Sequence, residues 1–360
     1  MNNPFSRRDF IKLAGAGAIG AALPGCATGP QARTVGRVVV IGGGFGGATA
    51  ARYIRAWSAG AVEVILVERN AEFVSCPLSN LVLGGSRQIA ELTRGYGRLR
   101  DEGVTVVHDE VTAIDAARKK ISLARASEMA YDRLVVSPGV DFLYEQIAGY
   151  DTEAQRTVLH AWQAGPETVA LRRQLEAMRD GGVVLLSIPK APYRCPPGPY
   201  ERISQIASYL KQAKPKSKIL VLDGNEDIVS KKGLFLAAWN DLYKGLIQYM
   251  PNNEVKEVAA KAGSVKTDFE AFKGDVLNVI PPQRAGNIAA QAKLITTNNR
   301  WCDVDWLTME SKSVPGVHVL GDATLAASAM PKPASMANSP AQTAAAARVP
   351  TSATTKRLGG

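Results

Sequence analysis

The fold class is decided by residues 37–47, RVVVIGGGFGG. The apolar, β-branched run over 37–41 is typical of a buried parallel strand. It ends in a G-x-G-x-x-G made of Gly42, Gly44 and Gly47, and residues 48–58 have a helix-compatible sequence. A strand, a glycine turn and a helix in this order predict the first unit of a dinucleotide-binding fold.

Each part of this unit has a physical role in holding a dinucleotide. The first glycine makes the tight turn, the second lets a pyrophosphate approach the backbone, and the third lets helix and strand pack closely. A second strand over 62–67 ends at Glu68, 21 residues beyond Gly47, where an acid hydrogen-bonds a ribose hydroxyl. The alternative is a glycine-rich turn without a ligand. The residues predicted to bind the dinucleotide here are Gly42, Gly44, Phe45, Gly47, Glu68 and Arg69.

Two later segments favour FAD over NAD as the dinucleotide. Residues 131–139 predict a strand that ends in Ser137-Pro138-Gly139, and residues 317–323 predict a strand that ends in Gly-Asp-Ala with Asp322 at its centre. These turns occur in this order in two-domain flavoproteins, where the aspartate contacts the ribityl chain or a phosphate. The strand from Val104 and the turn to Val111 are expected to pass under the adenine. We therefore add Ser137, Gly139, Asp322 and Val111 to the FAD-binding residues.

The middle of the chain predicts a second βαβ unit. Its strands are expected over 183–188 and 218–222, and its helices over 200–211 and 234–249. The turn after the first strand, residues 189–199, contains four prolines instead of glycines. Proline lacks an N–H donor, so we do not expect NAD(P)H to bind in the usual way.

These patterns predict an α/β protein with two Rossmann-like domains in a glutathione-reductase-like arrangement. The predicted domains are a discontinuous FAD domain over 35–150 and 276–347, and a second Rossmann-like domain over 151–275.

The first 29 residues predict an export signal. Ser6-Arg7-Arg8-Asp9-Phe10 is a twin-arginine motif, and a short Ala/Gly-rich apolar stretch follows it. We expect transport to the periplasm of a protein folded around its cofactor. Leu23-Pro24-Gly25-Cys26 loosely resembles a lipoprotein cleavage site, but anchoring at Cys26 is not the reading we favour.

Composition excludes several classes of function. The 360 residues carry a formal charge of +10, but no basic run is interleaved with aromatic residues, so we expect no nucleic-acid partner. Four widely spaced cysteines and three histidines offer no metal-binding motif, so we expect no metal. No stretch is long and apolar enough for a transmembrane segment.

The chain resembles the flavoprotein subunit of flavocytochrome c sulfide dehydrogenase, from about residue 37 to about 347. The resemblance rests on Ser75-Cys76-Pro77-Leu78-Ser79-Asn80, on Pro192-Tyr193-Arg194-Cys195-Pro196-Pro197-Gly198-Pro199-Tyr200-Glu201-Arg202, on Trp301-Cys302-Asp303-Val304-Asp305, and on Gly321-Asp322-Ala323 with Met330-Pro331-Lys332.

This resemblance implies an activity and a set of site residues. It implies FAD linked covalently through Cys76, and a redox-active Cys195 that reacts with hydrogen sulfide or polysulfide. Electrons would pass through FAD to a cytochrome c subunit, and haem c would lie only on that partner. The family's second redox cysteine follows the Met-Pro-Lys segment, so Cys302 is not expected to pair with Cys195. The alternative for Cys76 and Cys195 is a buried, inert side chain.

The C-terminal end departs from the family pattern. Residues 348–360 are polar and contain Pro350, so we expect an aberrant or disordered tail, a missing C-terminal interface domain and no second redox cysteine. Two alternative functions therefore stay open. One is a sulfide:quinone-type flavoprotein, and the other is a non-catalytic FAD-binding module.

Overall fold

The computed structural model describes residues 34–325, 332 and 334–347. The predicted export signal, Cys26 and the predicted tail over 348–360 lie outside the described residues. The described residues form one compact unit.

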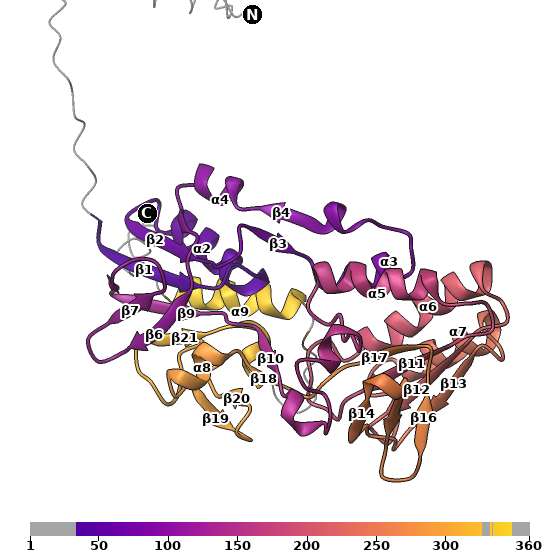
Figure 1. Cartoon of the computed structure of the whole chain (residues 1–360). Coiled ribbons are helices and arrows are strands. Elements are labelled where there is room, and N and C mark those ends of the chain that lie inside the picture. The colour runs from indigo at the N-terminus through magenta and orange to yellow at the C-terminus, as the bar shows by residue number, and fades with distance from the viewer. Residues whose placement is uncertain (1–33, 326–331, 333, 348–360) are drawn as a thin grey trace, which may run out of the picture. The chain divides into compact units, whose positions relative to one another are not determined.

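The first half of this unit is built on a five-stranded parallel sheet with the strand order β21-β9-β1-β2-β5 (Figure 1). Its strands are β1 (Gly36–Ile41), β2 (Val62–Val67), β5 (Thr105–Val107), β9 (Arg133–Val136) and β21 (Val317–Val319). Helices α2 (Phe45–Trp57) and α9 (Ala334–Ala346) pack against each other, although almost 300 residues separate them in sequence. Strand β21 belongs to the predicted part over 276–347, and the other four strands belong to the part over 35–150. The sheet therefore joins the two predicted parts of the FAD domain.

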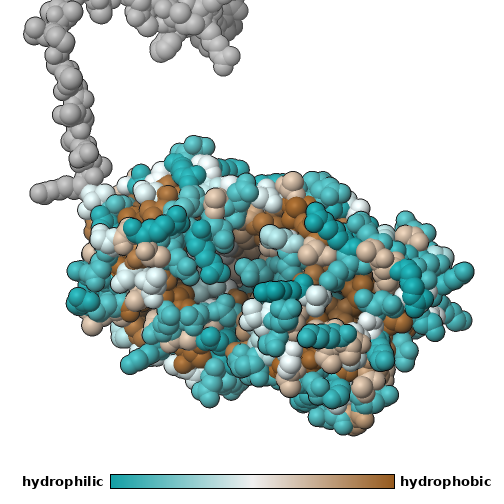
Figure 2. Space-filling model, in the orientation of Figure 1, coloured by the Kyte–Doolittle hydropathy of each residue, from teal (hydrophilic) through white to brown (hydrophobic). Residues whose placement is uncertain are grey.

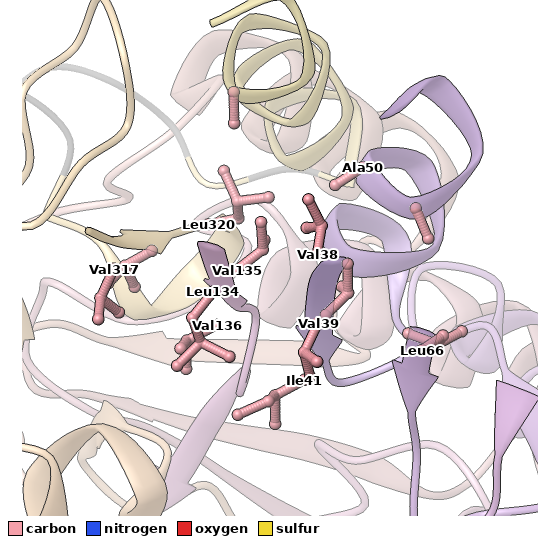
Figure 3. Close-up of a cluster of buried hydrophobic side chains, with 14 of the residues drawn as sticks. Val38, Val39, Ile41, Ala50, Leu66, Leu134, Val135, Val136, Val317 and Leu320 are labelled. Atoms are coloured by element: carbon pink, nitrogen blue, oxygen red, sulfur yellow. The ribbon is translucent and has the colours of Figure 1, made fainter. Parts of the chain in front are cut away.

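The core of this half consists of the apolar strands themselves (Figure 3). Val39, Leu66, Leu134 and Val135 are fully buried or nearly so, as the predicted buried strands require. Alanines of α2 and α9, among them Ala50, complete the cluster, and such small side chains let the two helices approach closely.

The second half is built on a four-stranded parallel sheet with the order β13-β12-β11-β17. Its strands are β11 (Val183–Ile188), β12 (Lys218–Asp223), β13 (Ile247–Met250) and β17 (Val276–Val279), and its helices are α5 (Pro166–Ala177), α6 (Gly198–Ala213) and α7 (Lys232–Leu242). The prediction of one helix over 234–249 is wrong at its C-terminal end. The helix ends at Leu242, Gly245 adopts a φ of +79°, and the chain continues as β13.

Two antiparallel strands, β10 (Val140–Phe142) and β18 (Gln283–Ala285), lie where the chain passes between the halves. Residues just before the predicted limit at 151 already pack on the second sheet, since Tyr150 donates a hydrogen bond to the Val279 carbonyl, 3.1 Å away. Strand β17 likewise pairs with β11 beyond the predicted limit at 275. We therefore propose wider limits for the second domain, which include Tyr150 and β17.

The remaining elements are short and connect or cover the two sheets. They are β3 (Glu72–Val74), α3 (Ser79–Leu83), η1 (Ile89–Leu92), β4 (Thr93–Gly95), α4 (Gly97–Asp101), β6 (Val111–Asp115), β7 (Lys120–Leu123), β8 (Met129–Ala130), η2 (Tyr144–Gln146), η3 (Ala154–Arg156), β14 (Glu257–Ala259), η4 (Ala260–Ala262), β15 (Ser264–Lys266), β16 (Ala271–Lys273), α8 (Asn287–Gln291), β19 (Ile295–Thr297), β20 (Trp301–Cys302) and η5 (Gly321–Ala323).

The surface is mixed in character. Figure 2 shows a largely hydrophilic face with scattered apolar patches. Among the described residues, no helix has the length and apolar character needed to cross a bilayer.

Candidate functional site

The glycine turn after β1 is shaped by close backbone contacts. Gly42 has a φ of +91°, and a Cβ there would lie 2.3 Å from the Ser137 carbonyl oxygen. A Cβ on Gly47 would lie only 1.8 Å from the carbonyl oxygen of Gly42. Gly44 is different, because a Cβ there would meet no atom within 4 Å. Two glycines therefore hold the turn together, and Gly44 leaves the backbone at the N-terminus of α2 open to a ligand.

Glu68 lies at the end of β2, beside this turn. One carboxylate oxygen accepts the Gly43 N–H at 2.6 Å, and the other accepts the Asn70 N–H at 2.8 Å. Both bonds orient the carboxylate at the edge of a cavity of about 840 Å³. The predicted residues that line this cavity are Gly42, Gly44, Glu68, Arg69, Cys76, Val111, Ser137 and Gly139.

A second, narrower cavity of about 160 Å³ adjoins the first. Cys76, Cys195 and Asp322 line it, and they come from segments far apart in the sequence. Gly44, Cys76 and Arg194 line both cavities, so the two form one continuous hollow. Phe45 also lines the narrow part. Of the predicted residues only Gly47 does not line the hollow, and its role is the close packing described above.

Cys195 is held firmly by the loop that precedes α6. Its backbone adopts a left-handed φ of +55°, which is uncommon for a residue with a side chain. Burial raises the pKa of its thiol to about 11, and the neighbouring Arg194 opposes that shift. A Cβ on Gly198 would lie 3.1 Å from the Cys195 sulfur and 2.8 Å from the Trp162 ring, so this glycine leaves room for both.

The cysteines of the described residues are all free. Cys76 lies just before α3, and the Ala164 N–H lies 3.5 Å from its sulfur. Cys302 is fully buried in β20, and burial raises the pKa of its thiol to about 12. The absence of a bond between Cys195 and Cys302 stays a prediction, because every described cysteine is free.

Arg202 has no predicted function, yet it lines the narrow cavity and is 1% exposed. Its guanidinium donates to the Asn80 side chain at 3.0 Å, the Asn278 side chain at 3.1 Å and the His160 carbonyl at 2.6 Å. Burial lowers its pKa to about 9. Arg202 and Asn80 belong to motifs that carry the family resemblance, but only the fold brings their side chains together. Other lining residues that were not predicted are Phe73, Trp162, Arg194, Glu201 and Lys332.

The acidic residue that ends β12 on the second sheet is used differently from Glu68 on the first. Asp223 ends β12, where a Rossmann unit normally presents its ribose-binding acid. Its carboxylate is buried and accepts the hydroxyls of Tyr200 at 2.7 Å and Tyr249 at 2.8 Å. The loop of residues 189–197 replaces the glycine cradle, and Asn225 also bonds to Asp223, at 2.7 Å. That NAD(P)H does not bind here in the usual way stays a prediction, and the tyrosine and asparagine partners of Asp223 support it.

Among the described residues, no group of His, Cys, Asp or Glu side chains is arranged to hold a metal ion. The lining of the hollow includes the glycine turn, two cysteines, an aspartate and buried cations.

Comparison with known families gives three matches along the chain. Residues 168–281 match the central region of the sulfide dehydrogenase [flavocytochrome c] flavoprotein chain, and residues 36–167 match pyridine nucleotide-disulphide oxidoreductases. Residues 4–24 match the twin-arginine translocation signal, so the protein is exported to the periplasm.

Three individual proteins are also similar to this chain. The chain is 54% identical over 46 residues to a sulfide dehydrogenase [flavocytochrome c] flavoprotein chain of Chlorobaculum thiosulfatiphilum, covering 94% of that sequence and 13% of this chain. It is 24% identical over 315 residues to the mitochondrial sulfide:quinone oxidoreductase of Mus musculus, covering 80% of this chain but only 65% of that protein. The solved sulfide:quinone oxidoreductase of Aquifex aeolicus superposes with a TM-score of 0.72 at 17% identity, covering 89% of this chain and 78% of that one, which shows a common fold.

Proposed function

Because this chain belongs to the flavoprotein family of flavocytochrome c sulfide dehydrogenase, within the pyridine nucleotide-disulfide oxidoreductases, we propose that it is a periplasmic, FAD-dependent sulfide oxidoreductase that passes electrons to a cytochrome c. The haem belongs to the partner subunit in this proposal. The substrate is hydrogen sulfide or a polysulfide.

One observation carries the proposal. Cys76, Cys195 and Asp322 line the same narrow cavity, and that cavity continues over the open backbone at Gly44. A flavin ring in the narrow part and an adenosine diphosphate in the wide part would fill the continuous hollow. The reacting cysteine would then lie beside the ring.

The residues of this chain divide the work of holding FAD. Glu68 accepts from the ribose, and the N-terminus of α2 faces the pyrophosphate. Asp322 contacts the ribityl chain, and Cys76 forms the thioether. When bound, FAD accepts an electron pair and releases the electrons singly.

The same cavity favours an anionic sulfur substrate. Arg194 and Arg202 are cations in its lining, and Arg202 is cut off from water, so its field attracts hydrosulfide more strongly than that of an exposed cation would. The carboxylates of Glu201 and Asp322 line the same cavity and oppose this attraction where they are ionised, and burial raises the pKa of Asp322. Hydrosulfide and the Cys195 thiol would combine into a cysteine persulfide anion and release two protons and two electrons, and FAD, when bound, would supply the acceptor for that electron pair.

The first test concerns the flavin. The exported protein is denatured and precipitated, and the pellet is examined for flavin and for an FAD-sized mass on the peptide that contains Cys76. We expect flavin on that peptide, and none in the pellet of a Cys76→Ala control. Flavin that washes away from the wild type would make Cys76 structural. A colourless protein would overturn the proposal and favour a non-catalytic module.

A second test concerns the electron acceptor, because the 24% identity to a sulfide:quinone oxidoreductase favours quinone as an alternative. The flavin is reduced with sulfide in a stopped-flow instrument and then mixed with cytochrome c or with a soluble quinone analogue. Faster reoxidation by cytochrome c is the expected result. Faster reoxidation by the quinone would replace the cytochrome in the proposal, and failure of sulfide to reduce bound FAD would refute the sulfide activity.

A further inference from the structure

Lys332 is a buried ammonium group in the wall of the narrow cavity. Its side chain is 8% exposed, and its Nζ donates to the backbone carbonyl of Asp322 at 3.0 Å. The same nitrogen lies 3.4 Å from the centre of the Trp301 ring, a cation–π contact. Two contacts thus hold the ammonium inside the protein, beside the residues that would surround a flavin.

The charged groups around Lys332 do not offset the effect of burial on its pKa. Burial lowers its pKa to about 7, and Arg300 acts in the same direction. Asp322 and Cys302 oppose the shift, but they do not outweigh burial. Arg300 also contacts Trp301, and its guanidinium lies 5.3 Å from the centre of that ring. Burying an ammonium group without a neutralising partner lowers the stability of the protein. Ionisable groups with strongly shifted pKa values therefore cluster at functional sites.

The sulfide chemistry described above leaves this lysine without a role. A flavin gains negative charge when it is reduced, so a fixed cation beside the ring favours the reduced form over the oxidised form. We propose that Lys332 sets the reduction potential of the FAD bound in this cavity, making it a better acceptor for electrons from sulfide. This inference rests on the proposed function, because it requires FAD in the cavity.

The position of Lys332 also predicts a pH signature. Near neutral pH the ammonium is partly deprotonated while the flavin is oxidised, and the negative charge of the reduced flavin restores the proton. Reduction above about pH 7 therefore takes up an additional proton in the wild type. The midpoint potential then falls more steeply with pH above this value than below it.

Three variants of the FAD-loaded protein test the inference. Lys332→Met removes the charge and keeps a similar length, whereas Lys332→Arg keeps a charge that does not titrate. Lys312→Met is the matched control, because Lys312 is 57% exposed, lies outside the cavity lining and pairs with Asp303 at 3.1 Å. The midpoint potential is measured from pH 6 to pH 9 by following flavin absorbance against a reference dye.

Each variant has its own expected midpoint potential. We expect Lys332→Met to shift the equilibrium with the dye at least tenfold toward oxidised flavin, about 30 mV for two electrons. Lys332→Arg should stay within about threefold of the wild type but lose the steeper fall, and Lys312→Met should change neither. Equal potentials in the wild type and Lys332→Met would overturn the inference, as would a steeper fall that persists in both Lys332 variants. Wild-type protein without flavin would overturn the proposed function as well.

Discussion

Substituting two neighbouring glycines separates the packing role of the turn from its binding role. Gly47→Ala introduces a Cβ 1.8 Å from the Gly42 carbonyl oxygen and 3.3 Å from the Ser137 Cβ, well inside ordinary contact. The obstacle is backbone, so it cannot rotate away. Overpacking of this kind costs about 3 kcal/mol at the upper end of its usual range, and the better helix propensity of alanine returns about 1 kcal/mol. We expect a net loss of about 2 kcal/mol in the free energy of unfolding.

Gly44→Ala is the matched substitution with the opposite expectation. Its Cβ meets no protein atom within 4 Å, so we expect a loss of at most about 1 kcal/mol, because alanine is a poorer N-cap residue than glycine. The added methyl group occupies the cavity face where the pyrophosphate would lie. Loss of one close backbone contact costs about 1–3 kcal/mol, which weakens FAD binding roughly tenfold to a hundredfold.

The assay uses the Cys76→Ala background, so that FAD can be removed and added back. Urea unfolding of the apoprotein gives the free energy of unfolding, and quenching of flavin fluorescence gives Kd. The reasoning is refuted if Gly47→Ala unfolds at the wild-type urea concentration, or if Gly44→Ala binds FAD as tightly as its parent.

Three further outcomes follow from the buried polar groups. Arg202→Met should cost about 3 kcal/mol or more in urea unfolding, because it leaves three neutral amide and carbonyl acceptors buried without their donor, at about 1–3 kcal/mol each. Unchanged stability would show that water replaces the guanidinium. Tyr249→Phe removes one of two tyrosine hydroxyls from Asp223 and should cost about 1–3 kcal/mol while leaving flavin content unchanged; a loss of flavin would contradict a purely structural role. Alkylation of Cys195 in the flavin-free protein, read by peptide mass, should accelerate as pH rises toward about 11, because burial keeps the thiol protonated below that pH. A rate that levels off near pH 8 would contradict this assignment.

Local sequence patterns were sufficient to predict the first sheet and most of the residues that line the wide part of the cavity. The run over 37–41 is apolar along its whole length, and Gly42, Gly44 and Gly47 follow at a spacing that few other structures use. These are properties of adjacent residues, so a single sequence carries them. The prediction of one helix over 234–249 was wrong because local patterns can be ambiguous. A short helix followed by a strand has an apolar pattern that resembles one longer helix.

The charge inside the cavity was decided only by the tertiary structure. Arg202 finds its acceptors on Asn80, His160 and Asn278, and Lys332 is held by Trp301, so none of these contacts has a local signature. An arginine or a lysine in a sequence is ordinarily a solvated surface group. The sequence by itself determined the glycine turn at the cavity, because turn geometry is local. Folding determined that buried cations line the narrow part of that cavity, because burial depends on how distant segments pack.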